Sequence, residues 1–143
     1  MTSMIILGLN ASVFIALALL HFSWALGNEW GFDAALPKKE NGERLMTPRK
    51  VDSFIVGIGL LGIAVYYLAM GKWIALGLPE WLMNYGLWAI AAIFLLRAIG
   101  EFRYVGLFKK ITTTDFARLD TRLYSPLCLF LSFSAFYLIL GVA

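Results

Sequence analysis

Charged residues are scarce in this chain of 143 residues. Lysine, arginine, aspartate and glutamate make up only 15% of it, while 61% of the residues are hydrophobic. A soluble domain of this size has too little interior to bury so many apolar side chains. The composition therefore excludes an ordinary soluble protein and predicts that the bilayer is the solvent for most of the chain. Since nothing in the sequence divides it, we expect a single membrane domain over residues 1–143.

Cysteine and histidine are almost absent. The only cysteine, Cys128, excludes an internal disulfide and a paired-cysteine redox or zinc site. The only histidine, His21, cannot supply both axial ligands of a haem within one chain. Glycine-rich phosphate loops, zinc-ligand spacings and nucleic-acid-binding signatures are also missing. We therefore expect no cofactor, no metal site and no nucleic-acid partner.

Four apolar segments are long enough to cross about 30 Å of hydrocarbon at about 1.5 Å per residue. Each is expected to be a helix, because irregular backbone cannot satisfy its polar groups in lipid. The first is long for a signal peptide and follows no basic residue, so we expect it to be retained. The predicted fold class is all-α, a polytopic bundle of four transmembrane helices, with a short amphipathic interfacial helix before the last one. Ser125 is the expected N-cap of that last helix and Pro126 its first residue. The helices are predicted at about 4–26, 53–72, 82–104 and 126–142.

Basic residues are concentrated in two of the three connections. The loops over residues 27–52 and 102–124 hold ten lysines and arginines, whereas the short connection between the second and third helices holds only Lys72. By the positive-inside rule, both long loops are expected to be cytoplasmic and both termini outside, in a multi-pass protein of the inner membrane. Topology alone is then sufficient to explain Lys109 and Lys110.

Small residues recur at four-residue spacing, as at Ser53 and Gly57 in the second helix. Such rows let membrane helices approach closely. They favour packing inside one bundle, and a homo-oligomer through the same face is the alternative.

Polar residues within the apolar segments gather near one end. His21 lies near the inner end of the first helix, with Trp24 at i+3 on the same face. Arg97 lies about one turn inside the inner end of the third helix, and Glu101 follows at i+4. An arginine at this depth can extend its guanidinium to the interface. A pair between Arg97 and Glu101 that touches lipid phosphate is one sufficient explanation.

The stretch TTTDFARLDTRLYSP adds a carboxylate in an unexpected place. Thr114 can cap a short helix beginning at Asp115, whose apolar stripe would lie on the inner membrane surface. Asp120 falls on that apolar stripe and has no basic residue at i±3 or i±4. A carboxylate in a low-dielectric region needs a cation or several donors. The candidate cations are Arg97, Arg103 and His21.

These residues predict a polar pocket at the cytoplasmic end of the bundle. Two interpretations stay open: an ion-pair lock that fixes the surface helix to the bundle, and a site for a ligand or substrate. In the second, Arg97 and Arg103 would meet an anionic head, because guanidinium groups make paired bonds to phosphate or carboxylate. Asp120 and Glu101 would hold the two arginines in place. The predicted pocket consists of His21, Trp24, Arg97, Glu101, Arg103, Asp120 and Tyr124, with Trp24 and Tyr124 at its apolar mouth.

The leading functional prediction is the binding or handling of a small amphiphile or an anionic lipid, with membrane lipids as partners. The alternative is a membrane-embedded enzyme on a lipidic substrate, with His21 or Asp120 as the acid–base group. A small oligomeric transporter is a third hypothesis, which few polar residues near mid-membrane support. A hydrolase triad of Ser125, His21 and Asp120 lacks a nucleophile elbow. Whether the protein is an enzyme is left open.

Three motifs in order carry a family resemblance. HFSWALG contains His21 and Trp24, RAIGEFRYVGLFK contains Arg97 and Arg103, and FARLDTRLYSPLCL contains Asp120. Together they resemble an uncharacterised bacterial family of small four-helix integral membrane proteins, catalogued as a domain of unknown function. The resemblance covers nearly the whole chain. It implies the fold and a membrane location in bacteria, and it implies no activity, substrate or catalytic residue.

Overall fold

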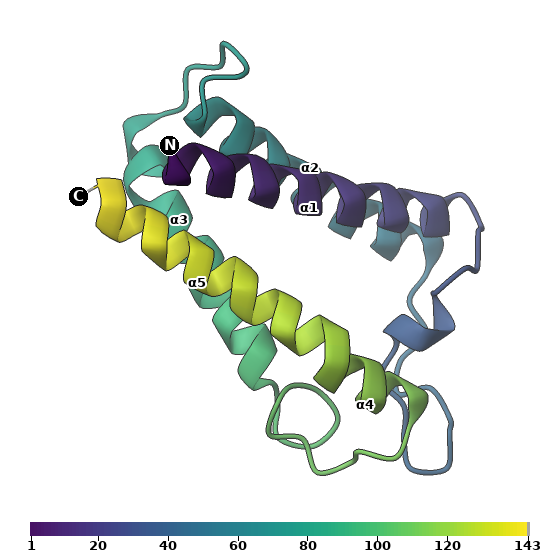
Figure 1. Ribbon diagram of the computed structural model, residues 1–143. Coiled ribbons are helices and arrows are strands. Elements are labelled where there is room, and N and C mark those ends of the chain that lie inside the picture. Colours follow the sequence, from purple (N-terminus) through teal and green to yellow (C-terminus); the bar gives the residue numbers. More distant parts are fainter. Residues whose placement is uncertain (143) are drawn as a thin grey trace. The chain divides into compact units, whose positions relative to one another are not determined.

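The computed structural model describes residues 1–142 (Figure 1). The long helices are α1 (Thr2–Ala25), α2 (Lys50–Met70), α3 (Glu80–Ile99) and α5 (Ser125–Val142). The short elements are η1 (Asp33–Ala35), α4 (Asp115–Leu119) and η2 (Asp120–Tyr124). Within the described residues, four helical segments are long and apolar enough to cross a membrane, namely α1, α2, α3 and the run Asp115–Gly141. The predicted all-α membrane fold is confirmed.

The chain groups into two compact units, and each is described by itself. The first comprises Met1–Asn28, Pro48–Leu87 and Tyr137–Ala143, and the second comprises Glu29–Thr47 and Trp88–Phe136. The first unit therefore holds the pair α1 and α2, and the second holds the long polar loops together with most of α3 and α5.

In the first unit, α1 packs along α2 through aromatic side chains. The rings of Phe14 and Tyr67 stack with centroids 5.8 Å apart, and both residues are fully buried. Gly57 marks a close approach of the two helices, because a methyl group there would lie only 2.7 Å from the ring of Phe22. The small residue at this position of the Ser53–Gly57 row thus serves packing within the unit.

Polar side chains in the middle of α1 bond to their own helix. The Asn10 amide nitrogen donates to the Ile6 carbonyl at 2.8 Å, and the Ser12 hydroxyl donates to the Gly8 carbonyl at 2.8 Å. Both pairings are the i−4 bonds that small polar residues make within apolar helices. In the second unit, Ser132 on α5 instead bridges two helices, since its hydroxyl donates to the Ala91 carbonyl of α3 at 2.8 Å.

The segment from α4 to α5 differs from the prediction. Thr114 caps α4 as expected, because its hydroxyl oxygen accepts the Ala117 N–H at 3.1 Å. The predicted break before Pro126 is wrong: α4 continues through η2, a single π-helical turn, directly into α5. In that turn the Ser125 N–H donates to the Asp120 carbonyl, five residues earlier. Pro126 has no N–H to donate, and a π turn accommodates a missing bond without ending the helix. Ser125 is consequently inside the helix and is not its N-cap.

The loop between α1 and α2 is tied by one carboxylate. Asp33 in η1 accepts from Lys38 Nζ at 2.6 Å and from Arg44 Nε at 2.8 Å. Lys38 and Arg44 also form an isolated antiparallel bridge, so the three residues close a small hairpin. The hydrogen bond from Lys38, followed by that from Arg44, lowers the pKa of the Asp33 carboxyl.

This loop is expected to loosen in acid. The pKa of Asp33 is lower in the folded chain than in the unfolded chain. The ionised carboxylate therefore stabilises the folded loop fully above the unfolded pKa, about 3.9, and this stabilisation is lost as pH falls through the folded pKa. A carboxyl NMR titration should show Asp33 titrating below its usual pKa in the wild type and closer to that value in Lys38→Gln. The control is Lys39→Gln, whose lysine pairs with Glu43 at 3.6 Å instead. Equal titration of Asp33 in both variants would contradict the assignment.

Candidate functional site

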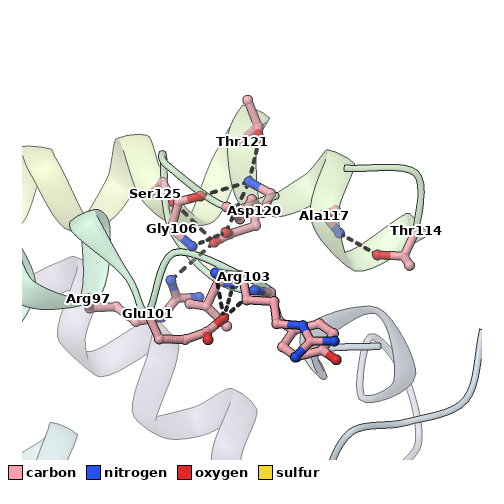
Figure 2. Close-up of polar contacts among 12 residues, drawn as sticks. Arg97, Glu101, Arg103, Gly106, Thr114, Ala117, Asp120, Thr121 and Ser125 are labelled. Atoms are coloured by element: carbon pink, nitrogen blue, oxygen red, sulfur yellow. Dashed lines mark hydrogen bonds and ion pairs between the residues drawn. The ribbon is translucent and has the colours of Figure 1, made fainter. Parts of the chain in front are cut away.

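Asp120 is the centre of a buried polar cluster in the second unit (Figure 2). Its residue exposure is 0%. Oδ1 accepts from Arg97 Nη1 at 3.1 Å and from the Ser125 hydroxyl at 3.1 Å. Oδ2 accepts from the Gly106 N–H at 2.7 Å and lies 3.3 Å from Lys109 Nζ. The carboxylate therefore has two cations and two neutral donors, and these partners offset the cost of removing its charge from water.

Lys109 is the member of this cluster that sequence reasoning missed. Its side chain is only 1% exposed, and Nζ donates to the Gly106 carbonyl at 2.9 Å and to the Thr121 hydroxyl at 2.5 Å. The interpretation of Lys109 as a topology determinant alone is therefore wrong. The available signal was the need of Asp120 for a cation, with a lysine eleven residues earlier in the chain. Nothing in the sequence distinguishes Lys109 from the exposed Lys110.

The loop after α3 brings Lys109 to Asp120. The third helix was predicted to continue to residue 104, but α3 ends at Ile99. Gly100 and Gly106 follow with φ of +78° and +93°, and Phe102 has φ of +69°. The loop then closes on itself, as the ring drawn after α3 in Figure 1 shows, and the Leu107 N–H donates to the Ala98 carbonyl at 2.8 Å. Two glycines that adopt left-handed backbone at either end of the loop explain the early end of the helix.

Glu101 serves this loop and does not pair with Arg97. Its Oε1 accepts the backbone N–H groups of Arg103 at 3.2 Å, of Tyr104 at shorter range, and of Val105 at 3.1 Å. The predicted i+4 relation between Glu101 and Arg97 does not exist, because the helix has already ended. Among the described residues Glu101 forms no ion pair with Arg97.

Arg103 and Tyr124 each make a contact that the sequence did not predict. The Arg103 side chain is exposed, and its guanidinium lies over the Tyr104 ring, 5.1 Å from the centroid. Of the three candidate cations for Asp120, Arg97 is confirmed, and Arg103 forms no ion pair with it in the described part of the chain. The Tyr124 hydroxyl donates to the Ala34 carbonyl at 3.1 Å, which fastens the last helical run to η1.

His21 and Trp24 belong to the first unit. The His21 Nδ1 lies 2.8 Å from the Leu17 carbonyl oxygen, so Nδ1 carries the proton of this hydrogen bond. The ring meets that of Trp24 edge-on, with centroids 4.8 Å apart. Both contacts lie within α1, and they fix the orientation of the imidazole.

The charges in the Asp120 cluster do not cancel. Arg97 and Lys109 contribute two positive charges against the single negative charge of Asp120, so the ionised cluster carries a net charge of +1. Arg97 is its exposed part, since 34% of the Arg97 side chain is accessible compared with 1% for Lys109. The arrangement can therefore attract an anion and offer it guanidinium N–H groups.

A family model described as "Protein of unknown function (DUF3995)" matches residues 14–135 of this chain. No curated protein and no solved structure matches it. The match includes every residue of the Asp120 cluster, and the chain belongs to this family.

Proposed function

We propose that this member of the DUF3995 family binds the anionic head of a lipid or small amphiphile through Arg97. The observation that carries the proposal is the unbalanced positive charge of the Asp120 cluster, whose exposed part is the Arg97 guanidinium. Lipid phosphates and carboxylates are the anions most abundant at the end of a membrane helix.

The geometry leaves Arg97 able to bind a second partner. Asp120 engages one terminal nitrogen, Nη1, whereas a guanidinium has five N–H groups in a planar fork. Because Glu101 is used by the backbone of its own loop, it does not compete for the remaining N–H groups. Asp120 thus acts as a positioning residue that holds Nη1 of the guanidinium, while 34% of the Arg97 side chain stays accessible.

Arg103 supplies a second cation close by in the sequence. Its guanidinium is exposed and rests on the Tyr104 ring, a contact that limits its motion. Two arginines on one loop and the adjoining helix end suit a headgroup with several anionic oxygens. We infer that Arg97 makes the specific contact and that Arg103 adds long-range attraction, which salt would screen.

The enzyme and transporter hypotheses gain less support. An acid–base group must reach its substrate, but Asp120 is fully enclosed, accepts hydrogen bonds from three groups and pairs with Lys109 as well. Polar side chains in the middle of α1 are bonded to their own helix backbone. Lipid binding is therefore the function that we propose.

The location of the site is part of the proposal. The basic residues of loops 27–52 and 102–124 favour a cytoplasmic position for both loops, which would place Arg97 at the cytoplasmic leaflet of a bacterial inner membrane. The anionic lipids of that leaflet would then be the natural ligands.

Substitution of Arg97 tests the proposal directly. In native mass spectrometry of the detergent-solubilised protein, Arg97→Gln should lower the affinity for phosphatidylglycerol about tenfold, the loss of roughly one charge-assisted bond. Arg97→Lys should retain part of the affinity, because the charge stays and the planar fork is lost. The matched control is Arg118→Gln, at an exposed arginine that lies 4.0 Å from Asp115. Unchanged affinity in Arg97→Gln, or an equal loss in Arg118→Gln, would overturn the proposal.

A further inference from the structure

The end of α2 contains a lysine in a conformation that glycine normally adopts. After Met70 and the cap residue Gly71, Lys72 has φ of +60°. The Lys72 N–H donates to the Ala69 carbonyl at 3.0 Å, and the Trp73 N–H donates to the Leu68 carbonyl at 3.1 Å. This pair of bonds is a Schellman motif, whose left-handed position is occupied by glycine in most proteins. A side chain here carries a conformational penalty, and such a penalty points to a role for the side chain.

Lys72 also lines an open hollow of about 540 Å³ in the first unit. Its other lining residues are all apolar or glycine, with Ala69 from α2, Leu76 and Leu78 from the connection, and Met83 from α3. Leu76 and Met83 are 49% and 41% exposed. The hollow thus combines an apolar wall with a single cation. Among the described residues no hydrogen bond or ion pair is formed by the Lys72 ammonium.

The position of this hollow at the ends of two candidate membrane spans suits a phospholipid headgroup. It lies where the candidate span α2 ends and the candidate span α3 begins, at Met70 and Glu80. Trp73 and Trp81, which flank the connection in the sequence, are 48% and 64% exposed, as tryptophans of the membrane interface are. In the sequence, the residues that line the hollow surround the start of α3 at Glu80, whereas Arg97 lies near its last residue, Ile99. The hollow is therefore a different site from the Arg97 site, and the predicted topology assigns it to the other leaflet.

We infer that the hollow binds one acidic phospholipid, whose phosphate contacts the Lys72 ammonium and whose acyl chain lies against Leu76 and Met83. One cation above an apolar wall complements one anionic group above a hydrocarbon chain. Carboxylate amphiphiles share this chemistry, but the position of Lys72 at headgroup depth favours a lipid that is part of the bilayer.

Lys72→Gly separates the binding role from the backbone strain. In an Arg97→Gln background, which weakens the first site, Lys72→Gly should raise the midpoint of thermal unfolding by roughly 3 °C. The same variant should bind phosphatidylglycerol about fivefold more weakly in native mass spectrometry. Lys72→Gln should lose affinity equally without the gain in stability, and Lys72→Arg should bind as the parent does. Lys110→Gln, a variant at an exposed lysine of the other unit, is the matched control.

Several outcomes would overturn the inference. One is equal affinity of Lys72→Gly and its parent for phosphatidylglycerol. Another is equal affinity of the parent for phosphatidylglycerol and phosphatidylcholine, because the hollow would then not select an acidic headgroup. A third is Lys72-dependent binding of oleate without binding of phosphatidylglycerol, which would assign the hollow to free fatty acids. Because Arg97 is already substituted in every sample, none of these outcomes bears on the proposed function of the Arg97 site.

Discussion

Replacement of Gly100 with alanine is expected to destabilise the protein by about 2–5 kcal/mol. Gly100 has φ of +78°, a conformation in which a β-carbon costs about 1–2 kcal/mol. The added methyl group would also overlap the Val105 carbonyl, and at Gly106 it would overlap the Ile99 carbonyl. Both obstacles are backbone atoms, which cannot rotate away as a side chain can. The free energy of unfolding, measured by far-ultraviolet circular dichroism in mixed micelles at increasing denaturing detergent, should fall in Gly100→Ala and in Gly106→Ala.

Gly59→Ala is the matched control for these variants. Gly59 lies within α2, and a methyl group there would meet nothing within 4 Å. Since alanine favours helix by up to about 1 kcal/mol over glycine, this variant should be as stable as the wild type or more stable. If Gly100→Ala matched Gly59→Ala in stability, the closed loop from residue 100 to 106 would be refuted.

The sequence was sufficient to predict the membrane fold, because apolar length and helix formation in lipid are local properties. Four segments of about 20 apolar residues permit few alternatives, and the Thr114 cap is a local signal of the same kind. The predicted end of the third helix at residue 104 and the predicted start of the last helix at Pro126 were wrong, because longer-range contacts determine the backbone there. Periodicity could not reveal that Gly100 closes a loop against Val105, nor that a π turn lets α4 continue into α5.

The candidate site was predictable only in part for the same reason. Asp120 was identified because its helical neighbours are apolar, and Arg97 because it lies near the end of an apolar helix. Lys109 depends on the path of the loop, which no local pattern encodes. The predicted pairing of Glu101 with Arg97 was wrong because it assumed that α3 continues through Glu101, whereas α3 ends at Ile99. The apolar neighbours of Asp120 thus predicted a buried acceptor, whereas the path of the loop determines which groups donate to it.

Asp120→Asn should cost about 3–5 kcal/mol of stability in the same unfolding experiment. The substitution removes a negative charge and leaves Lys109, whose side chain is 1% exposed, as a buried cation without a counterion. The control is Asp115→Asn, at an exposed carboxylate 4.0 Å from Arg118, which should change stability by less than about 0.5 kcal/mol. In Asp120→Asn combined with Lys109→Met, the orphaned cation is gone, so the double variant should be less destabilised than the sum of the single variants by roughly 1–3 kcal/mol.

These variants also distinguish the ion-pair lock from the ligand site, because Asp120 has the structural role and Arg97 the binding role. Asp120 holds Gly106, Lys109 and Ser125 as well as Arg97, so Arg97→Gln leaves three of its four partners in place. A small stability loss with a large loss of lipid binding is therefore expected for Arg97→Gln. Asp120→Asn should lose stability first and binding as a consequence, because the guanidinium is no longer held. The proposed roles would be refuted if Asp120→Asn and Lys109→Met each lowered the free energy of unfolding no more than Asp115→Asn and their effects were additive. The cluster would then neither fix the loop to the last helical run nor position Arg97.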